Sequence, residues 1–159
     1  MNSREEQTHI SIRRAGREDV PAIVRLLADD KLGSGRENYQ DPLPEAYYAA
    51  FEEIDGDKHN ELLVLEAEGE VRGTLQLTFI TGLSFQGAKR AQIEAVRVDS
   101  RYRGQGLGRQ LIQWTIQRAR QENCRLVQLT TNNDRADAHR FYQELGFVAS
   151  HTGMKLDLG

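Results

Sequence analysis

Apolar residues recur along this chain with two different periods, and the order of these periods restricts the possible folds. A repeat every three to four residues predicts helices, and strict alternation predicts strands with one dry face. The expected order is strand, two helices, three strands, helix, strand, helix and two short strands. The main strands are expected near 9–14, 61–65, 74–80, 91–98 and 126–131, and the helices near 18–27, 45–54, 107–119 and 138–145. This order favours a mixed α/β (α+β) fold around one sheet.

The strand expected at 91–98 contains a charged residue in an apolar setting. Strict alternation places Gln92, Glu94, Val96 and Val98 on one face, and Ile93, Ala95 and Arg97 on the other. Glu94 then shares a face with two valines, unless a bulge shifts the register.

A glycine-rich segment, Arg103-Gly104-Gln105-Gly106-Leu107-Gly108, joins this strand to the long helix that follows. Glycines at a helix start let the backbone approach an anion, which the free N–H groups and the helix dipole stabilise. Two known phosphate loops are excluded by spacing. No Gly-Lys-Ser/Thr is present, and the glycines lie at relative positions one, three and five rather than one, three and six. A structural tight turn is the alternative.

The charge is unevenly distributed along the chain. In total there are 21 Lys and Arg against 24 Asp and Glu, a net charge of −3. By segment the net charge is −8 over residues 1–88, +6 over 89–125 and −1 over 126–159. The positive charge of residues 89–125 favours an anionic ligand. The alternative is a solvated surface on which basic residues are in excess by chance. A sequence pI near 5.8 argues against nucleic acid as the partner.

Composition indicates the cellular compartment and the kinds of partner that we expect. The single cysteine, Cys124, rules out an internal disulfide, and no apolar run approaches the roughly 20 residues of a membrane span. We therefore expect a cytoplasmic protein without a membrane partner. The four histidines show no metal-ligand spacing, so no metal is expected. Residues 1–7 are expected to be a flexible tail and residues 8–159 one domain.

The glycine segment and its surroundings resemble a known family. Arg103-x-x-Gly106-x-Gly108, preceded by Ile93-Glu94-Ala95-Val96-Arg97-Val98, resembles the acetyl-CoA signature of the GNAT superfamily of N-acetyltransferases. The run from Arg140 to Phe147 resembles the closing helix and strand of the same family. The resemblance implies a single GNAT-like domain with a mixed, mostly antiparallel central sheet and helices on both faces. Its fourth and fifth strands would splay apart to admit the pantetheine arm of acetyl-CoA.

Carried over residue by residue, the resemblance implies a site for acetyl-CoA as co-substrate. Main-chain groups of Val96, Arg97 and Val98 would contact its acetyl and pantetheine part. The pyrophosphate would be held by backbone N–H groups of Arg103, Gly104, Gln105, Gly106, Leu107, Gly108 and Arg109. Many relatives carry a pantetheine-binding asparagine where this chain has Arg135. Asn132 or Asn133 takes that role if the loop is arranged differently, or Arg135 instead reaches a CoA phosphate.

Acetyl transfer to an amine requires a neutral amine and a proton for the departing thiolate. Glu94, on the strand expected beside the thioester, is the candidate base. The alternative is a structural carboxylate paired with Arg97 or Arg90. Tyr142, at the position of the family's tyrosine near the CoA sulfur, is the candidate acid, and an ordinary core aromatic is its alternative.

The acceptor is expected to be a primary amine of a small molecule or peptide. By family resemblance it binds near the irregular loop of residues 36–44, through Arg36 and Tyr39 together with Glu94, although these loop residues are equally consistent with a solvated surface. A homodimer is also plausible on the resemblance. Two rival functions are a non-catalytic acyl-CoA sensor or regulatory protein, and transfer to a hydroxyl or of a longer acyl chain.

Overall fold

The computed structural model of the protein describes residues 8–159. The flexible tail predicted at residues 1–7 lies outside the described residues. Two compact units divide the chain, the first ending at Gln128 and the second running from Leu129 to Gly159. Among the described residues, no helix has the length and apolar character needed to cross a membrane.

Five strands form one sheet in the order β1-β2-β3-β4-β5. They are β1 (Ile10–Arg14), β2 (Asn60–Ala67), β3 (Glu70–Thr81), β4 (Lys89–Val98) and β5 (Cys124–Leu129). Each of the first three pairs antiparallel with the next. β4 leads to β5 through helix α4 (Leu107–Gln121), the kind of crossover that parallel neighbours require. The predicted mixed, mostly antiparallel sheet is confirmed.

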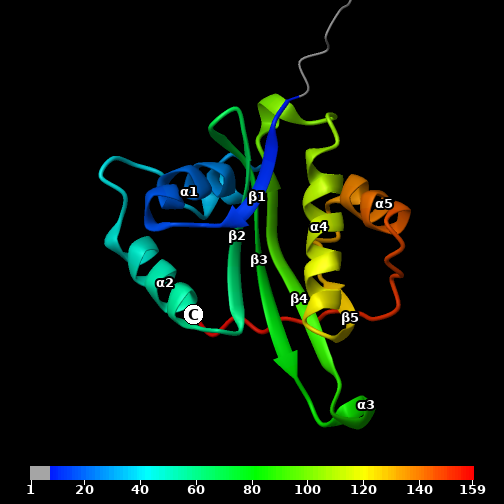
Figure 1. Cartoon of the computed structure of the whole chain (residues 1–159). Helices are drawn as coiled ribbons and strands as arrows, with labels where there is room; N and C mark the ends of the chain where they lie inside the picture. The colour runs from blue at the N-terminus through cyan, green and yellow to red at the C-terminus, as the bar shows by residue number, and fades with distance from the viewer. Residues whose placement is uncertain (1–7) are drawn as a thin grey trace, which may run out of the picture. The chain divides into compact units, whose positions relative to one another are not determined.

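Helices cover both faces of this sheet, as predicted (Figure 1). Helices α1 (Val20–Ala28) and α2 (Glu45–Gly56) lie on one face, and α4 lies on the other. The single turns η1 (Arg17–Asp19), η2 (Gly33–Gly35), α3 (Ser84–Gly87) and η3 (Ser100–Tyr102) lie in the connections. Helix α1 ends at Ala28, where Asp29 leaves helical geometry and accepts a hydrogen bond from Ser100 Oγ at 2.6 Å.

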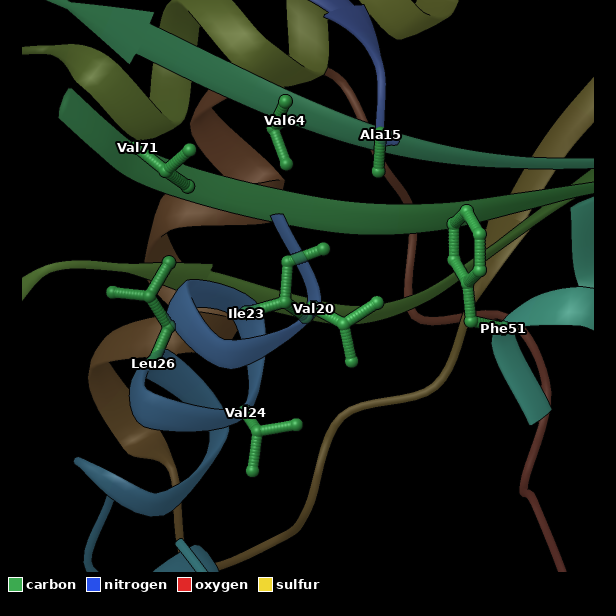
Figure 2. Packing of buried hydrophobic residues seen from close by; sticks show 8 residues of the cluster. All are labelled: Ala15, Val20, Ile23, Val24, Leu26, Phe51, Val64 and Val71. Carbon is green, nitrogen blue, oxygen red and sulfur yellow. The ribbon is translucent and has the colours of Figure 1, made fainter. Parts of the chain in front are cut away.

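One half of the core lies between the sheet and the α1/α2 layer. Figure 2 shows its buried members, which are Ala15, Val20, Ile23, Val24, Leu26, Phe51, Val64 and Val71. The buried residues that belong to α1 are spaced one to three positions apart and lie on one face of the helix, as the helical period predicts. Burying each large aliphatic side chain contributes about 1.5–3 kcal/mol. This cluster therefore fixes both helices onto the sheet.

The other half of the core lies under α4. Its fully buried members are Leu63 and Leu65 of β2, Leu75 and Leu77 of β3, and Leu111 and Ile112 of α4. Helix α4 packs directly over Gly73, because a Cβ at that position would lie in van der Waals contact with Leu111 Cδ2 at 3.6 Å. The dry face predicted over residues 74–80 is confirmed, whereas Thr74, on the face expected to be wet, is buried and donates from Oγ1 to the Leu63 carbonyl at 2.8 Å.

A buried ion pair also attaches α4 to the sheet. The Glu61 side chain of β2 is only 2% exposed, and its Oε1 accepts hydrogen bonds from Arg118 Nη2 of α4 at 2.5 Å and from Arg14 Nη2 of β1 at 2.9 Å. Burial raises the pKa of Glu61, but the hydrogen bonds from the two arginines outweigh it and hold the pKa below its usual value. The glycine segment begins the same helix, so this pair helps to position it.

The second unit contains helix α5 (Ala136–Glu144) and a segment without regular structure. The two short strands expected at the end of the chain are not formed within residues 146–159. The large apolar side chains of this segment include Val148, Met154, Leu156 and Leu158, each at least 81% exposed. Because these apolar side chains are not buried, the segment gains no packing that would stabilise a strand.

Candidate functional site

The glycine-rich segment forms an open loop at the start of α4. Gly104 and Gly106 have left-handed φ values of 76° and 79°, which suit glycine. Gly106 is the N-cap of α4, and a Cβ built on either glycine would meet no atom within 4 Å. The first N–H groups of a helix have no partner within it, and they carry the positive end of the helix dipole. The loop therefore fits a phosphate group.

The remaining predicted members of this loop differ in burial. Leu107 is 4% exposed and fixes the start of α4 to the core. Arg103, Gln105 and Arg109 are exposed, and Gly108 lies in the first turn of the helix. The two arginines add positive charge beside the open N-terminus. The structure thus brings the predicted phosphate-binding residues into one loop.

A buried cluster of charges holds the residues just before this loop. Asp99, whose side chain is 1% exposed, accepts hydrogen bonds from Arg101 N at 3.0 Å, Arg101 Nη2 at 2.8 Å and Arg25 Nη1 of α1 at 3.1 Å. Arg101 Nη2 also lies 2.5 Å from Glu70 Oε1. The bonds from Arg101 and Arg25 hold the pKa of Asp99 well below its usual range. The cluster thus anchors the backbone from which the loop departs, and no sequence pattern predicted it.

Strand β4 contains a bulge next to Glu94. The pairing partner of Glu94 in β3 is Gln76, and that of Arg97 is Thr74. Three steps along β4 therefore match two steps along β3, and the extra residue is accommodated at Ala95, whose φ is 54°. A bulge of this kind re-aims side chains and often lies beside a functional site.

The bulge corrects the faces expected from strict alternation. Glu94 and Arg97 pair with residues on the α1/α2 side of β3, so they share that face. Val98 pairs with Gly73, whose missing side chain faces α4. The prediction that Val96 and Val98 share a face with Glu94 is therefore wrong, whereas the bulge raised as its exception is present.

The Glu94 carboxylate is exposed, and the described residues provide it with no hydrogen-bond or ion-pair partner. Arg97, one of the partners considered for it, instead lies 3.6 Å from Asp30 Oδ2 and donates to the Val96 carbonyl at 2.8 Å. The structure thus does not form the structural pair, and Glu94 is accessible to a substrate.

The loop between α1 and α2 carries the two residues predicted to bind the acceptor. Tyr39 is 51% exposed and lines a shallow hollow with Asp29 and Arg101, among others, at the end of β4. Arg36 is exposed and pairs with Glu37 at 3.2 Å. The lining of that hollow includes neither Arg36 nor Glu94, so the structure does not join these three residues in one pocket.

Tyr142 belongs to the second unit, where it lies on α5. Its ring packs edge-on against Phe141 and Phe147, with centroid distances of 5.1 and 5.7 Å. Such aromatic packing restricts the orientation of the ring. The side chain is half-buried.

The loop before α5 holds the residues considered in place of the family's asparagine. Asn132 Oδ1 accepts a hydrogen bond from Asp134 N at 2.9 Å, so it stabilises the loop itself. Asn133 is exposed, and Arg135 is the half-buried N-cap of α5. Asn132 is exposed as well, so the two asparagines differ in that the Asn132 oxygen is used within the loop.

Comparison with known proteins decides the family. The acetyltransferase (GNAT) family profile matches residues 22–147. The chain belongs to the GNAT acetyltransferase family. Aminoalkylphosphonate N-acetyltransferase of Salmonella typhimurium (strain LT2) is 31% identical over 152 residues, covering 95% of this chain and 94% of that protein. Glucosamine 6-phosphate N-acetyltransferase of Trypanosoma brucei brucei is 34% identical over 90 residues, covering 57% and 59%.

Solved structures support the same assignment of this GNAT protein. A Bacillus halodurans C-125 protein described as a transcriptional regulator is 51% identical, with a TM-score of 0.92 over 94% of this chain and 100% of that one. A putative acetyltransferase from Agrobacterium tumefaciens str. C58 is 27% identical, with a TM-score of 0.82 over 92% and 99%. The fold implied by the sequence resemblance is thus confirmed.

GNAT proteins use acetyl-CoA, and the pyrophosphate of CoA is an anion of the type that the open loop fits. In the part of the GNAT chain that the structure describes, no group of three or more His, Cys, Asp or Glu side chains is arranged to hold a metal ion. Sequence analysis missed the anchoring residue Asp99. It also missed the polar side chains of β2 and β3 beside Glu94, although the alternation of Gln76 and Thr78 with leucines had placed them on one wet face.

Proposed function

We propose that this GNAT protein is an acetyl-CoA-dependent N-acetyltransferase that acts on a primary amine of a small molecule or peptide. The observation that carries this proposal is the Glu94 carboxylate, exposed and without a partner in residues 8–159, on a bulged strand that leads into the loop fitted for phosphate. An exposed carboxylate beside an expected thioester suits a general base.

Acetyl-CoA supplies an acetyl group on a thioester. The residues from Arg103 to Arg109 would hold its pyrophosphate, and the main chain of Val96 to Val98 its pantetheine and acetyl end. Glu94 takes a proton from the amine, directly or through water. A bond from the amine nitrogen to the acetyl carbon forms as the carbon–sulfur bond breaks, and Tyr142 gives a proton to the departing sulfur.

The proposed attack is direct, without an acetylated cysteine. Cys124 is the only cysteine of the chain, and burial raises the pKa of its thiol. A raised pKa lowers the fraction of nucleophilic thiolate. This supports a reaction in which the amine itself attacks the thioester.

A thiol-release assay with acetyl-CoA tests the proposal. The amine panel contains 2-aminoethylphosphonate, glucosamine 6-phosphate, spermidine and a lysine-containing peptide, and mass spectrometry identifies any acetylated product. We expect at least one amine to give CoA and its N-acetyl derivative. If acetyl-CoA raises the melting temperature while no amine of a widened panel releases thiol, the protein is instead an acyl-CoA sensor.

A further inference from the structure

A row of amide and hydroxyl side chains lies beside Glu94 on the α1/α2 face of the sheet. Strand pairing sets this row: Asn60 of β2 is opposite Thr78 of β3, and Gln76 of β3 is opposite Glu94 of β4. Asn60, Gln76 and Thr78 are each partly exposed. The row is therefore accessible to a small molecule that approaches Glu94.

Asp57, at the end of α2, determines how the first amide of the row is turned. Its carboxylate accepts hydrogen bonds from His59 N at 2.8 Å and from Asn60 Nδ2 at 2.7 Å. These two bonds lower the pKa of Asp57, so it is ionised and can only accept. Asn60 must then present its NH₂ group to Asp57 and its carbonyl oxygen to β3.

The orientation of Asn60 determines that of Gln76. Asn60 Oδ1 accepts from Gln76 Nε2 at 3.1 Å and from Thr78 Oγ1 at 2.7 Å. Gln76 thus uses its NH₂ group on Asn60, and its Oε1 makes no hydrogen bond within residues 8–159. Opposite residues of an antiparallel pair have Cβ atoms about 4.5–5.5 Å apart. The Gln76 and Glu94 side chains therefore start from neighbouring positions, and Gln76 Oε1 and the Glu94 carboxylate can only accept hydrogen bonds.

On the β5 side of β4, a further side chain also presents a hydrogen-bond acceptor. Gln128 of β5 donates from Nε2 to Gln92 Oε1 at 2.6 Å. The carbonyl oxygen of Gln128 makes no hydrogen bond in the described part of the chain. It adds one more acceptor to the same face, on the opposite side from Gln76.

We propose that Gln76 Oε1 and the Glu94 carboxylate together bind the acceptor's primary amine in its protonated, ammonium form, with Asp57 and Asn60 as positioning residues. An ammonium has three donors and no acceptor, so it complements this set of oxygens. The inference rests on the proposed function and deepens it, because it selects primary ammonium compounds over alcohols. One proton passes from the ammonium to the Glu94 carboxylate, giving a neutral amine and a carboxylic acid, and Glu94 then releases it to water.

Steady-state kinetics with the fastest amine of the panel test this inference. In Gln76→Leu, we expect the KM for the amine to rise roughly tenfold or more, as for a lost hydrogen bond to a charged group, while the KM for acetyl-CoA is unchanged. Gln76→Glu keeps an acceptor at that position and should leave the KM for the amine at or below the wild-type value. A rise in Gln76→Glu as large as in Gln76→Leu overturns the inference.

The role of Asp57 is tested by combining variants. Without Asp57 the Gln76 amide has two orientations, and halving the competent fraction raises the KM for the amine about twofold. In a Gln76→Glu background, where both oxygens accept, Asp57→Ala should not raise the KM for the amine, because Asn60 is then able to turn and donate to that carboxylate. An equal effect in both backgrounds shows a merely structural role for Asp57 and refutes the positioning. Asp55→Ala, which removes an exposed charge from the same helix, is the control.

The two proposals fail in different ways. If no amine is acetylated, the proposed function and the ammonium site fall together. If amines are acetylated while Gln76→Leu, folded by its melting temperature, keeps the wild-type KM for the amine, only the ammonium site falls.

Discussion

Replacing Glu61 with glutamine keeps the shape of the side chain but removes the charge that Arg118 and Arg14 share. Breaking a buried ion pair costs about 3–5 kcal/mol, because one charge stays buried without its partner. Here the cost is smaller, since Arg118 also pairs with Glu122 at 2.8 Å and the Arg14 side chain is 57% exposed. We expect a loss of about 2–3 kcal/mol at pH 7, which lowers the melting temperature by roughly 5–10 °C.

The effect should also depend on pH with a definite sign. The pKa of Glu61 is lower in the folded than in the unfolded chain. Its contribution is therefore complete above the unfolded value, about 4.3, and declines as the pH falls through the lower folded value. Urea unfolding of wild type and Glu61→Gln at pH 7 and below pH 4 measures this, with refolding shown to be reversible.

Glu52→Gln is the matched control. Arg17 and Glu52 are joined at 2.7 Å but are 51% and 68% exposed, so the loss should stay below about 1 kcal/mol. The reasoning is refuted if Glu61→Gln is no less stable than Glu52→Gln at pH 7, or if its deficit does not shrink in acid.

Three further predictions concern the proposed reaction. Gly106→Val should weaken acetyl-CoA binding at least tenfold in calorimetry, whereas Gly69→Val, which carries a similar left-handed φ of 73° in a hairpin, should lose stability but keep its affinity; equal affinities in both variants would reject the phosphate loop. Glu94→Gln should lower kcat/KM for the amine about 100-fold at pH 7 and recover partly as rising pH deprotonates the amine; a loss independent of pH points to a structural carboxylate. Tyr142→Phe should lower kcat about 100-fold with little change in acetyl-CoA affinity, and unchanged turnover removes Tyr142 as the acid.

The order of strands and helices was predictable because it depends on local periodicity. Residues 74–80 alternate strictly, and the leucines of that run are buried as expected. The bulge at Ala95 was not predictable in the same way, because a bulge is defined by the partner strand. Only the pairing of Glu94 with Gln76 and of Arg97 with Thr74 reveals it.

The charge count was informative about the glycine loop but overstated how much basic surface is available. Arg97, Arg101 and Arg118 contribute to the +6 segment, yet each is engaged with a carboxylate inside the fold. A count along the sequence cannot show which arginines pair with carboxylates of the fold. Arg103 and Arg109 are exposed and lie beside the loop, where the phosphate assignment needs positive charge.

The polar row beside Glu94 shows a second limit. Its members come from α2, β2, β3 and β4, so no local pattern joins Asp57 to Asn60 and Gln76. The wet face of β3 was visible in the sequence, but the direction in which each amide is turned depends on the ionised carboxylate at one end. That direction is a property of the hydrogen-bond network and appears only when the strands are paired.

The bulge in β4 divides the strand into two segments of opposite phase. Upstream of Ala95 even-numbered residues face α1 and α2, whereas downstream the odd-numbered Arg97 does so. Deleting Ala95 would place Arg97 two positions after Glu94, so both side chains would keep the α1/α2 face and β4 would alternate regularly without a bulge. A chimaera between GNAT chains should exchange residues 89–99 as one piece, because the extra residue and the two segments whose phase it sets then come from the same chain.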